Sequence, residues 1–478
     1  MIDGRRAGRA ALVLVVLAVL AAGCDWSHYR GGPTLAGVAI ESTLGVGNVA
    51  SLGERWRGKG PDAGLFDSPV VTGGRVYTSQ AVYDVNGGAS CVGTPKACDP
   101  LWTLPAASVL APTTVAGGRQ YRVPRSTGQG TLSAFDAAGI EGCSGVPKVC
   151  QPVRSWKHVF REVSDDVLSM TAPVVAGSTL YGAGFAQGVV ADLSSDAGCT
   201  GAPAVCPVAW SAIGQSQSVG VGPFGAAAVA NGTLYLTGAN APGGQLRAGL
   251  YAFDAAGVEG CSGSPRACTA RWTGDLGVPL DVGTAEGSTA PVVDGVVYVV
   301  ASWETGPPPP GQTNATGAAK VVAFDAAGVQ GCGGSPRVCQ PLWSAPLAGN
   351  AGNVWTAPAV AAGRLYVPTE SGVEVFDAKG VTGCSGSPKV CAPVATMSFG
   401  SAVGTRGGLT IANGVAYVGA RDGLYAFDAY LSQGCGGTPL VCQPLVHALG
   451  GTNVTTPAVI AGQVHVLSDG QVVTLGLP

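Results

Sequence analysis

The chain has 478 residues, enough for two or three ordinary domains or for one long repeat array with a large core. Only 12% of the residues are charged and the net charge is -3, which argues against a nucleic acid as partner, because such partners require a strongly basic surface. The 76 glycines and 33 prolines punctuate apolar runs of Val, Tyr and Leu, a pattern typical of short strands and tight turns.

The N-terminus has the features of an export signal. Arginines at positions 5, 6 and 9 precede an uninterrupted apolar stretch over residues 10–22. This stretch is too short to cross a bilayer as a helix, which takes about 20 residues. It ends in Leu-Ala-Ala-Gly-Cys, which resembles the lipobox of bacterial lipoproteins. We therefore expect a signal peptide over 1–23 and an exported protein of the cell envelope, anchored to a membrane by acylated Cys24. The alternative is an ordinary signal peptide whose removal leaves Cys24 as a free thiol.

Residues 24–51 are rich in glycine without clear periodicity, and we interpret them as a tether to a folded body over 52–478. In that body a hairpin pattern recurs: a short apolar run, a glycine-containing turn, and a second run with an aromatic residue or His. The eight copies read SPVVTGGRVYTS, APTTVAGGRQYRVP, APVVAGSTLYGAG, AAAVANGTLYLTG, APVVDGVVYVVAS, APAVAAGRLYVPT, GLTIANGVAYVGA and TPAVIAGQVHVLS.

A third strand follows each hairpin, seen best in LSAFDAAG, LYAFDAAG, VVAFDAAG, VEVFDAKG and LYAFDAY. Next come a Cys-x6-Cys loop and a fourth apolar run, which in five repeats carries a tryptophan: Trp102, Trp156, Trp210, Trp272 and Trp343. Four strands per repeat, arranged radially, predict a β-propeller. We expect the tryptophans to pack between blades and the Asp of the third strand to accept N–H bonds from the turn after it.

The ends of the chain predict how the ring closes. The eighth repeat has a hairpin and a third strand, QVVTLGL, and lacks a fourth strand. The segment LGERWRG around Trp56 is a fourth strand with no repeat before it. If this N-terminal strand completes the last blade, the fold is an all-β, eight-bladed propeller without open sheet edges at the seam.

Fourteen of the fifteen cysteines form seven Cys-x6-Cys pairs, each seven residues after an aspartate. Structural zinc sites usually have Cys-x2-4-Cys spacing, and one blade offers only two thiols, so we favour disulfides over metal sites. Closing such a loop contributes roughly 2 to 2.5 kcal/mol on the chain-entropy estimate. The predicted bridges are Cys91–Cys98, Cys143–Cys150, Cys199–Cys206, Cys261–Cys268, Cys332–Cys339, Cys384–Cys391 and Cys435–Cys442.

The hairpin, Leu-Tyr-Ala-Phe-Asp and Trp elements together resemble the repeats of the pyrroloquinoline-quinone-like β-propeller family. That family includes quinoprotein dehydrogenases and non-catalytic lipoproteins, such as the propeller subunit of the outer-membrane assembly machinery. The resemblance implies an adjacent Cys-Cys disulfide and a calcium-binding carboxylate set in the dehydrogenases. This chain has no adjacent Cys pair. We therefore expect the scaffold without a cofactor; the alternative is a quinone- or metal-dependent oxidoreductase.

No other catalytic motif stands out, since the four histidines show no metal-binding spacing, and His465 replaces a hairpin Tyr as an expected packed residue. The loops between blades, and those between second and third strands, vary most and share one face. On that face we expect a partner protein or envelope component to bind. The candidate partner-binding residues are Trp303, Glu304, Trp355, Arg421 and Asp422. An Asp-Gly hairpin turn is the structural alternative for Asp422.

Overall fold

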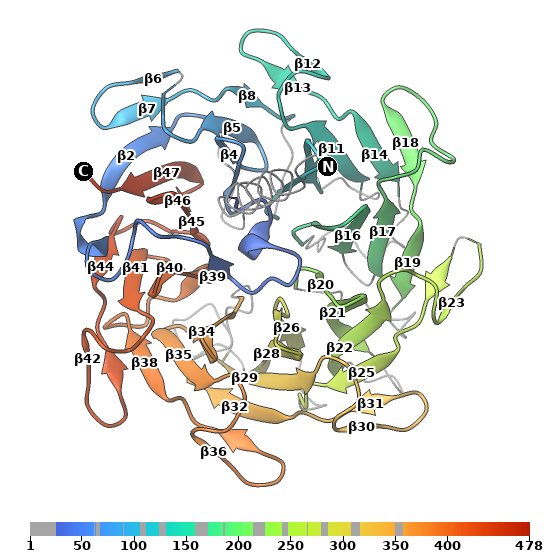
Figure 1. The fold of residues 1–478 in the computed structure, drawn as a ribbon, viewed down its shortest axis with the longest axis vertical. Helices are drawn as coiled ribbons and strands as arrows, with labels where there is room; N and C mark the ends of the chain where they lie inside the picture. Colours follow the sequence, from blue (N-terminus) through green and yellow to red (C-terminus); the bar gives the residue numbers. More distant parts are fainter. Residues whose placement is uncertain are drawn as a thin grey trace, which may run out of the picture.

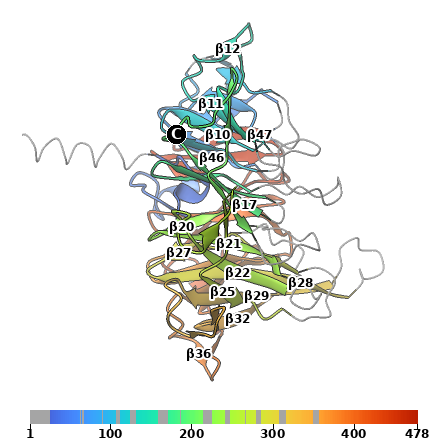
Figure 2. The ribbon, with the colours of Figure 1, turned by 90° about the vertical axis from the view of Figure 1, so that its right-hand side faces the viewer.

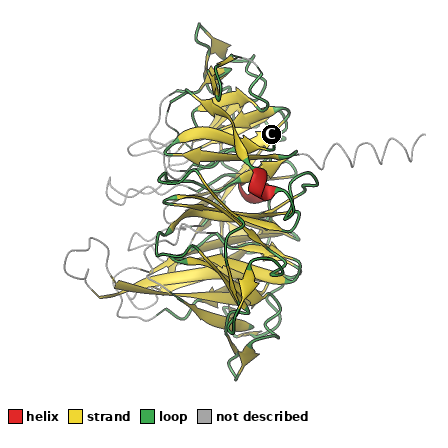
Figure 3. Cartoon of the chain, turned by 90° about the vertical axis from the view of Figure 1, so that its left-hand side faces the viewer, coloured by secondary structure: helices red, strands yellow, loops and turns green. Residues whose placement is uncertain are grey.

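Eight β-sheets surround a central axis and form a ring, which is a flat disc when viewed from the side (Figures 1, 2 and 3). The structure is a computed structural model. It describes residues 25–61, 63, 67–88, 90–105, 111–123, 131–157, 171–184, 187–213, 225–240, 247–264, 266–278, 285–306, 316–348 and 357–478. The predicted eight-bladed β-propeller is confirmed.

Each blade has four antiparallel strands, which we call the first to the fourth strand from the axis outward. Blades 1 to 4 consist of β3 (Val70–Thr72), β4 (Arg75–Tyr77), β5 (Ala81–Asp84) and β8 (Trp102–Thr103); β9 (Thr114–Ala116), β10 (Arg119–Arg122), β11 (Thr131–Asp136) and β14 (Arg154–Lys157); β15 (Val174–Ala176), β16 (Thr179–Gly184), β17 (Gln187–Asp192) and β19 (Trp210–Ile213); and β20 (Ala228–Ala230), β21 (Thr233–Asn240), β22 (Arg247–Asp254) and β25 (Trp272–Asp275).

Blades 5 to 8 follow the same plan. They consist of β27 (Val292–Val293), β28 (Val296–Gly306), β29 (Thr316–Asp325) and β32 (Trp343–Leu347), with β26 (Ala285–Gly287) also paired to β28; β33 (Ala359–Ala361), β34 (Arg364–Pro368), β35 (Gly372–Asp377) and β38 (Ala395–Ser398); β39 (Thr405–Ala412), β40 (Val415–Ala420), β41 (Gly423–Asp428) and β44 (Val446–Ala448); and β45 (Ala458–Ile460), β46 (Gln463–Ser468), β47 (Gln471–Gly476) and β2 (Gly53–Gly58).

The ring closes through the N-terminal strand, as predicted. Strand β2 pairs antiparallel with β47, with Trp56 opposite Thr474 and Arg57 opposite Val473. The last blade therefore combines three strands from the end of the chain with one from its beginning, and no sheet edge is left open at this seam.

All seven predicted disulfides are present, and each joins the two arms of a short hairpin between the third and fourth strands. The hairpin does not extend its own blade. It pairs in parallel with the outer strand of the preceding blade, as where Val149 lies opposite Thr103. The hairpin strands are β6 (Cys91–Val92), β7 (Lys96–Cys98), β12 (Cys143–Ser144), β13 (Val149–Cys150), β18 (Ala204–Pro207), β23 (Cys261–Ser262), β24 (Ala267–Cys268), β30 (Cys332–Gly333), β31 (Val338–Cys339), β36 (Cys384–Ser385), β37 (Val390–Cys391), β42 (Cys435–Gly436) and β43 (Val441–Cys442).

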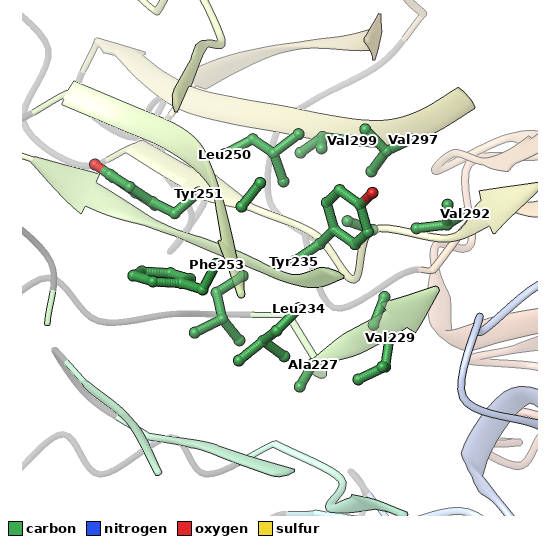
Figure 4. Close-up of a cluster of buried hydrophobic side chains, with 14 of the residues drawn as sticks. Ala227, Val229, Leu234, Tyr235, Leu250, Tyr251, Phe253, Val292, Val297 and Val299 are labelled. Carbon is green, nitrogen blue, oxygen red and sulfur yellow. The ribbon is translucent and has the colours of Figure 1, made fainter. Parts of the chain in front are cut away.

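A second contact repeats between blades and involves the outer-strand tryptophan. Gly328, in the turn after β29, lies against Trp272 of the preceding blade, and a Cβ at this position would overlap the indole Cδ1. The tyrosine of the second strand also reaches the next blade: the Tyr298 hydroxyl donates to the Ala378 carbonyl at 3.0 Å. Between blades 4 and 5 the Tyr235 hydroxyl makes the matching bond to the Ala326 carbonyl at 2.8 Å, and Figure 4 shows the apolar side chains that pack between these two blades. The tryptophans therefore pack between blades, as expected.

The repeated aspartates stabilise turns, also as expected. Asp254 accepts backbone N–H bonds from Val258 at 2.8 Å and from Glu259 at 2.9 Å. Partial burial disfavours the charged carboxylate, but these bonds outweigh burial and hold the pKa of Asp254 below its usual value. The aspartates are therefore part of the architecture and not a set of reactive groups.

His465 is fully buried where most hairpins have Tyr. Its Nδ1 lies 2.8 Å from the Thr474 hydroxyl oxygen, and its ring lies beside Trp56. Burial lowers the pKa of His465 to about 3. The ring is thus neutral in the folded protein, and the expected packing role is confirmed.

We predict that Gly328→Ala destabilises the protein more than Gly363→Ala. Both glycines have a positive φ, 65° and 74°. Each substitution should therefore cost about 1 kcal/mol of backbone strain. Only Gly328 faces an indole, whereas nothing lies within 4 Å of a Cβ at Gly363. Overpacking against Trp272 should add about 2 kcal/mol. Urea unfolding measures both, and equal losses would contradict the contact.

We predict that His465 contributes to acid unfolding. Its folded-state pKa, about 3, lies below the ordinary histidine pKa of about 6.5, so the unfolded chain binds an extra proton between these pH values. The free energy of unfolding should fall by up to about 1.4 kcal/mol per pH unit as the pH drops through this window. His465→Tyr restores the tyrosine of the other repeats and should remove this part of the pH dependence. Urea unfolding at a series of low pH values tests this, and the same loss of stability in the variant as in the wild type would refute it.

Candidate functional site

The channel along the axis of the ring is lined by residues 26–39, seen in blue inside the ring in Figure 1. This segment bonds to the inner strand of each of blades 1 to 7 in turn. The bonds are Trp26 N–H to Val71 O, Val115 N–H to Ser27 O, His28 Nε2 to Val175 O, Val229 N–H to Pro33 O, Val292 N–H to Thr34 O, Val360 N–H to Ala36 O and Ile411 N–H to Gly37 O.

The segment ends in β1 (Val38–Ala39), which pairs in parallel with β39. The Glu41 carboxylate then accepts the Gly462 N–H of blade 8 at 2.9 Å. Residues 26–39 therefore belong to the propeller, and the interpretation of 24–51 as a tether needs correction for them. Two short 3-10 helices, η1 (Tyr29–Gly31) and η2 (Val49–Ser51), complete this N-terminal part.

Arg30 occupies the interior of the channel and is only 1% exposed. Its Nη1 donates to the Leu409 carbonyl at 3.0 Å, its Nε donates to Leu35 O at 3.3 Å, and its Nη2 donates to Pro358 O. Burial lowers the pKa of Arg30 to about 10, so the guanidinium stays charged at neutral pH. The cation links the N-terminal segment to blades 6 and 7.

Residues 26–39 occupy the end of the channel at which the first-to-second-strand turns lie, with Trp26, Tyr29 and Leu35 buried there. The described residues therefore leave no surface for the planar ring of a quinone at that end. The sequence has no adjacent Cys pair to lie against such a ring. Over the described part of the chain, no three His, Cys, Asp or Glu side chains lie close enough to hold a metal ion.

The ring has two distinct faces. The turn face carries the first-to-second-strand turns and the disulfide hairpins, which are uniform. The loop face carries the connections between blades and between second and third strands. Much of the loop face of blades 1 to 6 lies outside the described residues, including 158–170, 214–224, 307–315 and 349–356. The loops of blade 7 and of its junctions with both neighbours are described.

Arg421 and Asp422 form the two-residue turn between β40 and β41 on the loop face. The Tyr425 hydroxyl donates to the Asp422 carboxylate at 2.9 Å. The Tyr425 ring is stacked on His447, with centroids 4.2 Å apart and an interplanar angle of 8°. Phe399 lies on the same tyrosine, 4.5 Å away. Burial, with Asp422 adding to it, raises the pKa of Tyr425.

Asp422 thus has the structural role that its Asp-Gly sequence suggested, and in addition it holds an aromatic stack. Its backbone carbonyl accepts the Gly451 N–H at 2.9 Å and lies 3.1 Å from His447 Nε2. Among the described atoms, its buried Oδ1 has no hydrogen-bond partner. Tyr425 and His447 were not among the residues predicted from the sequence. His447 could have been found there, because it directly follows the residue that replaces the outer-strand Trp.

The other candidate residues lie elsewhere. Trp303, in β28 of blade 5, is half-buried against the apolar core, and Lys320 Nζ lies 5.7 Å from its ring centre. The Glu304 backbone is in the same strand, opposite Gly317. Trp355 and Cys24 lie outside the described residues. Blade 6 separates Trp303 from the Arg421–Asp422 turn, so the candidates do not form one site.

No protein-family model and no curated protein matches the chain. Solved structures do match it. A europium-containing methanol dehydrogenase is 14% identical over 93% of this chain and 89% of its own, with a TM-score of 0.56. The computationally designed Ika8 protein is 11% identical over 89% of this chain and 99% of its own, with a TM-score of 0.53.

BamB from Moraxella catarrhalis is 13% identical over 85% of this chain and 81% of its own, and its TM-score of 0.42 is too low to support an argument. Within the described residues, no helix is long and apolar enough to span a membrane. At these identities the likeness shows the fold alone. The chain has an eight-bladed propeller fold similar to that of the methanol dehydrogenase, as the family resemblance implied.

We predict that Arg30→Met lowers the free energy of unfolding by about 3 kcal/mol, because it leaves buried carbonyls of the channel without their donor. Arg55→Met is the matched control, since Arg55 is exposed on β2. Urea unfolding of both variants tests this. Equal stability of the two variants would show that the channel segment is not held by Arg30.

Proposed function

We propose that this protein is an exported, lipid-anchored, non-catalytic propeller that binds a partner protein or envelope component through its loop face. The observation that carries the proposal is the position of residues 26–39, which bond to the inner strands of blades 1 to 7 at the turn-face end of the channel. The chain itself therefore occupies that end of the axis. Recognition is then left to the loops, which a rigid ring holds in place.

The described loop surface at blade 7 supports this use. The turn of Arg421 and Asp422 offers charge of both signs, and the stack of Tyr425, His447 and Phe399 holds that turn rigid. A preorganised polar patch over packed aromatic rings loses little entropy on binding. The oxidoreductase alternative would need its cofactor toward the loop-face end of the channel, because residues 26–39 occupy the turn-face end.

Export is supported by the disulfides, since seven structural bridges require an oxidising compartment. Trp26 pairs antiparallel with Val71, whose strand runs toward the turn face. The chain before Trp26 therefore points to the turn face, and the Cα of Cys24 is at most about 7 Å away. An acyl group on Cys24 would hold the turn face toward the membrane and the loop face away from it.

Acylation is tested by growing cells with an alkyne-tagged fatty acid. The wild-type protein should incorporate the tag and sediment with membranes, because the acyl chains supply the anchor. Cys24→Ser should lose both properties while keeping its seven disulfides in mass spectrometry without reductant. Tag retained by Cys24→Ser, or an untagged wild type, would refute the anchor.

Partner binding is tested by placing a photoreactive amino acid at Ser401, exposed in the loop between β38 and β39. Val258, which is 72% exposed on the turn face, is the matched control position. Irradiation of intact cells should yield one discrete crosslinked species from Ser401 and none from Val258. Crosslinks from Val258 alone, or the same species from both positions, would contradict the loop face as the binding surface.

A further inference from the structure

The junction between blades 2 and 3 departs from the repeat at its outer strand. Blade 2 has two extra residues between its disulfide and its tryptophan. In blade 1, Leu101 N–H donates to Val82 O at 2.8 Å and the next residue is Trp102. In blade 2, Val153 N–H makes the same bond to Ala134 O at 2.8 Å, and the next residue is Arg154. Arg154 therefore occupies the tryptophan position, and Trp156 lies two residues farther along.

The turn that should cover this position has also changed. The turns of blades 1, 2, 4, 5 and 6 place a glycine there, and blade 3 has Ser195. In the regular repeats a basic residue of the disulfide hairpin donates to that glycine carbonyl, as Lys148 Nζ does to Gly139 O at 3.1 Å. Blade 3 has Ala204 in place of the basic residue. Three parts of one inter-blade contact are thus replaced together.

A cavity of about 740 Å³ opens at this junction on the turn face. Tyr121 lines it, and within the described residues its hydroxyl lacks the bond to the next blade that Tyr298 makes to Ala378. Arg119, Arg154, Glu141 and Asp196 are also in the lining, together with Trp156. The volume falls in the range of small-molecule sites, about 300–1,000 Å³.

The junction between blades 6 and 7 shows that loss of the tryptophan alone does not explain the cavity. There Ala395 takes the tryptophan position, Leu431 the glycine position and Leu440 the basic position. Leu431 and Leu440 pack against the apolar core cluster of that junction. Apolar replacements therefore fill the space between blades 6 and 7, whereas the replacements between blades 2 and 3 are polar or small and leave space.

The cavity presents two guanidinium groups, each paired with an acidic side chain that is more exposed than the arginine. Arg119 lies 2.7 Å from Glu141, with side chains 34% and 60% exposed, and its second acidic partner, Asp136 at 3.7 Å, is 12% exposed and belongs to the turn. Arg154 pairs with Asp196, with side chains 19% and 82% exposed, and its guanidinium lies 5.5 Å from the Trp156 ring centre. Exposed pairs of this kind contribute only about 0–1 kcal/mol, so another anion can replace the carboxylates.

We propose that this cavity, between blades 2 and 3 on the turn face, binds a small organic anion that carries a carboxylate on a planar ring. The carboxylate pairs with Arg154 and Arg119 in place of Asp196 or Glu141. The ring takes the space that the glycine turn and the basic side chain fill at regular junctions. This site is on the opposite face from the proposed partner surface and does not depend on it.

Three probes that share one ring test the proposal in calorimetric titrations of the full chain. Indole-3-acetate is the anion, indole-3-ethanol is neutral and tryptamine is a cation. We expect indole-3-acetate to bind about tenfold more tightly than either of the others. Arg154→Gln should weaken the anion by about tenfold and bring it close to the neutral probe. Equal affinities of the three probes, or no heat from indole-3-acetate at millimolar concentration, would overturn the proposal.

Filling the cavity separates binding there from binding elsewhere. Ala204→Lys restores the basic residue of the repeat without removing any contact, so it should fold normally and lose indole-3-acetate binding. Val258→Lys adds the same charge at a position that is 72% exposed and lies outside the cavity lining, and it should bind like the wild type. Wild-type affinity in Ala204→Lys would place the ligand outside this cavity and refute the assignment.

Discussion

The contact on which this ring depends is the packing of one outer-strand tryptophan beneath the glycine turn of the next blade. At blades 4 and 5 the indole of Trp272 leaves no room for a side chain at Gly328. The same turn positions the disulfide hairpin that pairs with the preceding blade. Where both the tryptophan and the glycine are kept, a blade is therefore joined to its neighbour by side-chain packing and by backbone pairing together. Where polar residues replace this tryptophan and this glycine, at Arg154 and Ser195, there is a cavity between the blades.

The second constraint lies at the axis. Inner strands of a propeller leave N–H groups facing the channel, and buried N–H groups need acceptors. Residues 26–39 supply them to blades 1, 2 and 4 to 7, while His28 Nε2 donates to a carbonyl of blade 3 and Arg30 donates to carbonyls of blades 6 and 7. Residues 26–39 thus occupy the turn-face end of the channel, and the loop face is the surface that we propose for recognition.

Much of the fold was predictable because it is encoded locally and eight times. Hairpins, Asp turns and the Cys-x6-Cys bridges follow from short-range spacing, and the unpaired strand around Trp56 predicted the closure. The channel segment was missed because residues 26–39 have no periodicity and their partners are distant in sequence. The parallel pairing of each hairpin with the preceding blade was missed for the same reason. The candidate residues Trp303 and Asp422 were grouped by the face that they share, although they follow the fifth and seventh hairpins, whose blades are not neighbours.

Amide hydrogen exchange tests the filled channel most directly. The N–H groups of Val229, Val292, Val360 and Ile411 should exchange as slowly as those in the middle of the blades, because each donates to a carbonyl of residues 33–37. They should exchange fast in a chain that lacks residues 25–39. Fast exchange of these four amides in the full-length protein, with the outer strands still protected, would show an open channel and contradict the account.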